Sequence, residues 1–173
     1  MKRTLLNGLI LCGVFQLIFN QPTLADSQKE TMPTVAAPLK GVVKGLQGCK
    51  IPVYLPAWLP KLPEPNYASA VLNPPGSDPG YVVRLANQPG DDPPQSSLLF
   101  EIYGSKAMGK SKKDGKVSLG SGRIGYLRSS EGGNAGPSIE WESKTNNYSI
   151  GKLLTKEDLI KAAKSSVLVP ITK

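Results

Sequence analysis

The sequence lacks histidine altogether and has only two cysteines among its 173 residues. Without histidine the chain cannot form a Ser-His-Asp triad, a Cys-His pair or an imidazole zinc site. Two thiols, those of Cys12 and Cys49, are too few for a thiolate metal cage within one chain. These absences exclude many hydrolases and zinc proteins, and we expect neither a metal nor another cofactor.

Aromatic residues are also scarce, at 6 % of the chain, whereas glycine and proline are abundant, with 18 and 16 residues. This composition predicts many turns and short elements rather than long helices. Lysine and arginine together number 21 against 13 acidic residues, so the chain is basic, with a formal net charge of +8.

The first 25 residues have the pattern of a secretory signal peptide. Lys2 and Arg3 precede a mostly apolar stretch, residues 4–19, and residues 23–25 form a small-residue cleavage site before Asp26. The apolar stretch is shorter than the roughly 20 residues of a spanning helix, so we expect no integral membrane span after cleavage. An uncleaved N-terminal anchor is the alternative. The predicted location is the periplasm or a thylakoid lumen, or else the extracellular medium.

The remainder of the chain is predicted to form one domain after a linker. Residues 26–37 show no periodicity and contain Pro33, as expected of a linker, and residues 38–173 are long enough for a single core. Cleavage would leave Cys49 as the one remaining cysteine, so it cannot form a disulfide within the chain. A small buried side chain is the favoured interpretation, because free cysteine is often buried, and an intermolecular disulfide is the alternative.

Two apolar patterns open this domain. Leu39, Val42, Val43 and Leu46 follow helical spacing, which predicts a short helix from about residue 38 to 47. Residues 51–60 alternate proline with apolar side chains, and so many prolines exclude a helix or a central strand. We expect this segment to be an extended edge, named here the apolar strap, that packs four side chains on the core. An exposed apolar groove is the alternative. The four side chains are those of Val53, Leu55, Trp58 and Leu59.

The rest of the domain has the pattern of short strands divided by turns, followed by a helix. The predicted strands are residues 67–72, 81–86, 97–103, 117–119, 123–128, 138–143 and 148–151. Thr155 and Asp158 form the start of a capped C-terminal helix whose apolar stripe extends to Val167, with Pro170 after it. The prediction is an α+β fold, in which an antiparallel sheet of about six or seven strands packs on the C-terminal helix, with the short N-terminal helix at an edge.

The C-terminal third also resembles a known type of domain. A Gly-Tyr strand (residues 122–127), a Trp strand (139–141), a Tyr strand (147–150) and a capped helix (154–165) follow one another. This order resembles a bacterial exported domain of unknown function, of the anti-sigma-factor-associated or envelope type. The resemblance covers about residues 115–168. The domain that it points to is itself distantly similar to the lipoprotein-carrier fold. It implies a sheet packed on a helix, and it brings neither a catalytic set nor a carrier function.

Five lysines fall within eleven residues, with Asp114 as the one acidic residue between them. They are Lys106, Lys110, Lys112, Lys113 and Lys116, named here the lysine segment. Such a patch can bind an anionic protein, a cell-wall polymer or a lipid surface. A solvated loop is the alternative, because blocks of like charge are often found in loops. Nucleic acid is not an expected partner, since export removes the chain from it and no aromatic residue interrupts the lysines.

Acidic residues supply two further candidates. Glu140 and Glu142 share one face of a predicted strand and form a carboxylate pair of the kind that glycosidases use, although a solvated sheet face explains them as well. Asp78, Asp91 and Asp92 lie in loops but lack the ordered spacing of a calcium site.

We therefore expect an exported, non-catalytic binding or accessory protein that uses the lysine segment. The first alternative is a cell-wall glycan hydrolase that uses the carboxylate pair. The second is a carrier of an apolar ligand, which would need a cavity between sheet and helix.

Overall fold

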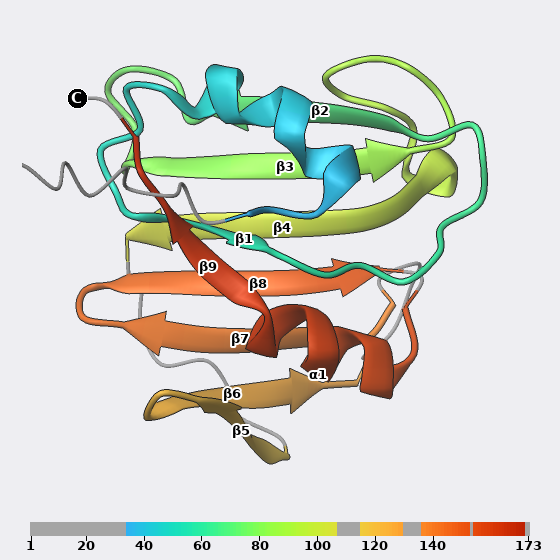
Figure 1. Cartoon of the computed structure of the whole chain (residues 1–173). Helices are drawn as coiled ribbons and strands as arrows, with labels where there is room; N and C mark the ends of the chain where they lie inside the picture. The colour runs from blue at the N-terminus through green and yellow to red at the C-terminus, as the bar shows by residue number, and fades with distance from the viewer. Residues whose placement is uncertain (1–33, 107–114, 130–135, 153, 172–173) are drawn as a thin grey trace, which may run out of the picture. The chain divides into compact units, whose positions relative to one another are not determined.

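The computed structural model describes residues 34–106, 115–129, 136–152 and 154–171. They form a seven-stranded antiparallel sheet with the strand order β2-β3-β4-β8-β7-β6-β5, and a two-stranded sheet of β1 and β9 (Figure 1). A C-terminal α-helix, a short N-terminal 3₁₀ helix and a second 3₁₀ helix, η2 (Gln95–Ser97), complete the α+β fold, which confirms the predicted class. The strands of the large sheet are β2 (Tyr67–Leu72), β3 (Gly80–Ala86), β4 (Leu98–Lys106), β5 (Lys116–Gly120), β6 (Arg123–Arg128), β7 (Ser138–Ser143) and β8 (Asn146–Lys152).

The large sheet follows from alternation of apolar and polar residues along its strands. In β7, Ile139 and Trp141 are buried, whereas Glu140 and Glu142 point to the other side. A two-residue turn, Lys144 and Thr145, joins β7 to β8, with Ser143 paired to Asn146. The strand residues of the core cluster, such as Val83, Ile102 and Ile150, line one face, on which the other elements pack.

The N-terminal helix η1 (Ala37–Leu46) packs on β2. It is a 3₁₀ helix whose buried side chains are those of Leu39, Val42 and Leu46. Gly48, at φ 80°, allows the chain to turn away after the helix. The buried residues begin before the helix, at Val35 and Ala36.

Within the apolar strap, β1 (Val53–Pro56) pairs with the last strand, β9 (Ser166–Val169). The C-terminal helix α1 (Lys156–Lys164) begins as predicted, with the Asp158 backbone N–H donating to Thr155 Oγ1 at 3.1 Å. Its predicted end is wrong, because Val167 lies in β9 and not in the helix. The hydroxyls of Ser165 and Ser166 donate to the Ala162 carbonyl, at 2.8 and 3.1 Å, where the helix ends.

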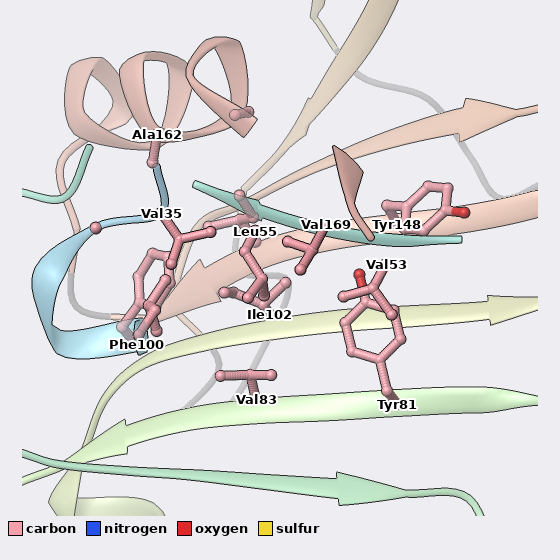
Figure 2. Packing of buried hydrophobic residues seen from close by; sticks show 14 of the residues in the cluster. Val35, Val53, Leu55, Tyr81, Val83, Phe100, Ile102, Tyr148, Ala162 and Val169 are labelled. Atoms are coloured by element: carbon pink, nitrogen blue, oxygen red, sulfur yellow. The ribbon is translucent and has the colours of Figure 1, made fainter. Parts of the chain in front are cut away.

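The core fills the space between the large sheet and the layer of η1, β1, β9 and α1 (Figure 1). Figure 2 shows Val53 and Leu55 of β1 pointing toward Val83 and Ile102 of the sheet, and all four side chains are fully buried. None of the described helices is long and apolar enough to cross a bilayer.

Candidate functional site

The other face of the large sheet, named here the open face, carries charged and hydroxyl side chains from several strands. The elements η1, β1, β9 and α1 lie together on the opposite side (Figure 1). Alternation along the strands brings to the open face Val71, Val82, Arg84, Glu101, Tyr103, Tyr126, Arg128, Ser138, Glu140, Glu142, Ser149 and Gly151.

The strand register arranges these residues in rows across the sheet. In one row Tyr103 lies beside Ser149, Ser149 beside Glu140, and Glu140 beside Tyr126. In the next row Arg84 lies beside Glu101, and Glu101 lies beside Gly151. Ser138 and then Arg128 continue this second row. Each row therefore has short side chains at its centre and long side chains on both sides.

Ion pairs hold the long charged side chains of the open face. Arg84 Nε lies 3.0 Å from Glu101 Oε2, and a second guanidinium nitrogen of Arg84 lies 3.4 Å from Asp92 Oδ1. Arg128 lies 2.9 Å from Glu140 Oε2 on the far side of the central strands. Such charge-assisted contacts fix the orientation of the side chains more firmly than single neutral hydrogen bonds do.

The predicted carboxylate pair lies on this open face and not across a cleft. Glu140 is half-buried and engaged by Arg128, whereas Glu142 is exposed. A glycosidase places its two carboxylates on opposite sides of the bond that it cleaves. Neighbours on one strand face do not provide that arrangement.

The lysine segment is described only at its two ends. Lys106 ends β4 and Lys116 begins β5, and both are exposed; Lys110, Lys112 and Lys113 lie outside the described residues. Lys106 pairs with the buried residue Asn146, whereas Lys116 pairs with Tyr126 on the open face. Four strand spacings separate β4 from β5, or about 19 Å. The structure thus places these two ammonium groups apart, on opposite faces of the sheet.

The apolar strap covers the core. Val53 and Leu55 are fully buried, and Trp58 and Leu59 are partly buried against the same cluster. The backbone N–H of Trp58 donates to Ser165 Oγ at 3.1 Å, and Lys161 Nζ lies 3.8 Å from the centroid of the indole ring. The indole therefore packs between the core and a lysine of α1.

The remaining candidates have local structural partners. Cys49 is buried, and burial raises the pKa of its thiol above the ordinary value of 9.0. The Asp91 carbonyl accepts a hydrogen bond from Arg84 at 2.9 Å, and Asp92 pairs with the same guanidinium. Across the described ranges no cluster of three or more His, Cys, Asp or Glu side chains is arranged to hold a metal ion.

The open face also contains a hollow that the sequence analysis missed. It has a volume of about 320 Å³ and lies at one end of the central strands, where β8 ends and β7 begins. Its lining consists of Gln95, Glu101, Gly136, Ser138, Ser149, Gly151 and Lys152, and we name it the serine hollow. The one available signal was Gly151 at the end of the predicted strand 148–151, because a glycine in a strand often marks a close approach or a missing side chain.

No protein-family model, curated protein or solved structure matches the chain. The resemblance to an exported envelope domain therefore stays a prediction, and function is argued below from the residues themselves.

Proposed function

We propose that this chain is an exported, non-catalytic binding or accessory protein that contacts an anionic partner through the lysine segment. The observation that carries the proposal is the exposure of the two described lysines and their lack of an ion pair with other described residues. Lys106 and Lys116 are exposed, and neither ammonium has an ion-pair partner among the residues that the structure describes. Charge that is not neutralised within the fold remains available to a partner.

The carboxylates of the open face support a non-catalytic role. A hydrolytic pair needs one carboxyl group to act as an acid and the other to act as a base or nucleophile. Glu101 and Glu140 are each engaged by an arginine at about the distance of a close ion pair, 3.0 and 2.9 Å. Each of these carboxylates is thus occupied by a charge-assisted contact within the fold.

The packing of the core argues against the carrier alternative. Phe100, Ile102 and Tyr148 of the sheet are no more than 1 % exposed, and Leu55 and Leu159 of the covering layer are fully buried. Their side chains occupy the space that an apolar ligand would need (Figure 2).

The test is co-sedimentation of the mature chain with vesicles of phosphatidylglycerol and phosphatidylcholine, and with the isolated envelope fraction, at low and moderate salt. The test variant carries Lys110→Ser, Lys112→Ser, Lys113→Ser and Lys116→Ser. A matched control removes four other lysines, Lys50, Lys61, Lys156 and Lys164, and so has the same net charge.

We expect the test variant to lose binding by about tenfold or more, and added salt to weaken binding by the native chain, because each lysine near an anionic surface contributes about 1 kcal/mol. The control should bind nearly as well as the native chain. An equal loss of binding in both variants would mean that binding depends on net charge alone and not on the lysine segment. Unchanged binding by the test variant would mean that the contact lies elsewhere on the chain.

A further inference from the structure

The serine hollow shares the open face with Lys116 but lies three strands away from it, on β8. Its floor is formed by Gly151 and Ser149 of β8 and by Ser138 of β7, two strands at the middle of the sheet (Figure 1). Gly151 has no side chain, and an added Cβ there would lie 3.1 Å from Ser138 Cβ. The depression therefore exists because the register aligns the shortest side chains of adjacent strands.

The wall groups of the hollow are polar and held in place. Glu101 accepts from Arg84 Nε at 3.0 Å, and Lys152 Nζ donates to Gln95 Oε1 at 2.7 Å. A carboxylate offers about four acceptor sites and an ammonium has three donors, so each group keeps hydrogen-bonding capacity after its contact within the chain. Ser138 and Ser149 add hydroxyls that both donate and accept.

This lining selects the chemistry of a ligand. Among the described residues it carries one acidic and one basic side chain, Glu101 and Lys152, whose charges are opposite. The described part of the lining has no large apolar side chain, which disfavours a lipid tail. Interleaved donors and acceptors match a molecule rich in hydroxyl groups.

An aromatic ring stands next to this polar floor. Tyr103 pairs with Ser149 across β4 and β8 and is 37 % exposed. The flat apolar surface of a tyrosine ring can pack on the C–H face of a sugar ring, while polar groups beside it bind the hydroxyls. A polar hollow next to an exposed tyrosine is therefore suited to a saccharide.

We propose that the serine hollow and Tyr103 together form a binding site for a neutral saccharide unit of a glycan. The site does not depend on the lysine segment, because Lys116 lies three strands from Ser149 and Lys106 lies on the opposite face. Each proposal can therefore fail while the other stands.

The experiment is a screen of the mature chain on an array of neutral, N-acetylated and acidic glycans, followed by calorimetric titration of the tightest neutral glycan. Three variants alter the site in different ways: Glu101→Gln weakens the acceptor, Tyr103→Ala removes the ring, and Ser149→Leu fills the hollow. Two controls change the same residue types elsewhere: Tyr67→Ala on the edge strand β2, which is 44 % exposed, and Glu157→Gln on α1.

We expect at least one neutral glycan to bind, and each site variant to weaken it by about tenfold or more, as the loss of a charged hydrogen bond or a well-packed contact does. The controls and the four-lysine variant should bind like the native chain. Thermal unfolding of each variant shows whether a loss of glycan binding is due to misfolding. The proposal is then judged on the variants that fold.

Three results would overturn the proposal. The first is an array with no neutral glycan bound. The second is recognition of acidic glycans alone, abolished by the four-lysine variant. The third is binding of a neutral glycan that folded Glu101→Gln, Tyr103→Ala and Ser149→Leu variants leave unchanged.

Discussion

Tyr81 shows how a single polar atom joins the two layers of the fold. Its hydroxyl donates to the Tyr54 carbonyl and accepts from the Tyr54 backbone N–H, both at 3.0 Å. Tyr54 lies in β1 of the strap and Tyr81 in β3 of the sheet, so the two hydrogen bonds connect β1 to the sheet beneath it. Because the tyrosine is fully buried, no water can replace these contacts.

Replacing Tyr81 with Phe should lower the free energy of unfolding by about 1–3 kcal/mol, because two buried backbone groups of Tyr54 lose their partner. Urea denaturation followed by circular dichroism measures the change. The matched control is Tyr103→Phe, which removes the same hydroxyl from a half-exposed ring and should shift stability by less than about 0.5 kcal/mol. Equal effects at both positions would show that the Tyr81 hydroxyl has no special role.

At the residue scale, the sequence predicts which side chains are buried better than it predicts a site. Alternation alone assigns Trp141 to the core and Glu140 to the wet face, and the structure agrees. The partner of Glu140, Arg128, lies on a different strand, so pairing depends on register. The serine hollow depends on the register of β4, β8 and β7 together, which no local pattern encodes.

Among the elements, local signals predict the strands of the large sheet and the start of α1. The turn-rich stretches delimit β2, β6 and β7 at the predicted residues, because proline and glycine end strands at definite positions. Local signals do not predict β9, since its strand conformation depends on pairing with β1, more than 100 residues earlier in the chain. Val167 has helical spacing from the α1 stripe, and this non-local pairing overrides that periodicity.

The β1–β9 sheet should contribute to stability through its inner side chains. Leu55→Ala should cost about 2–5 kcal/mol, because a fully buried leucine leaves a cavity between β1 and the large sheet. The matched control is Leu168→Ala on β9, where the side chain is 51 % exposed and the cost should stay below about 1 kcal/mol. Thermal and urea unfolding of both variants provide the comparison, and a small effect at Leu55 would mean that the strap is only loosely docked.

For the whole molecule, the beginning and the end of the described chain belong to one core. The backbone N–H of Ala36 donates to the Pro56 carbonyl at 2.9 Å, and β1 then pairs with β9 near the C-terminus. The most buried titratable groups are close to this junction. Tyr81, Tyr148 and Cys49 interact electrostatically with one another, and burial raises the pKa of all three groups.

Stability should therefore fall at alkaline pH. For the two tyrosines the ordinary pKa of 10.0 is raised in the fold, so the unfolded chain releases their protons at a lower pH than the native chain. The native state then binds more protons, and the free energy of unfolding decreases with rising pH, by at most about 1.4 kcal/mol per pH unit for each group. The contribution is fully present below about pH 9 and decreases progressively as pH rises past 10 toward the raised pKa values of the native state.

Urea unfolding between pH 8 and 11 measures this slope, and the comparison between variants separates it from the titration of lysines. The double variant Tyr81→Phe/Tyr148→Phe should be less stable at neutral pH but should show a flatter dependence on pH than the native chain. A double variant with the same slope as the native chain would assign the alkaline loss to Cys49 or to surface charge, and not to the two tyrosine hydroxyls.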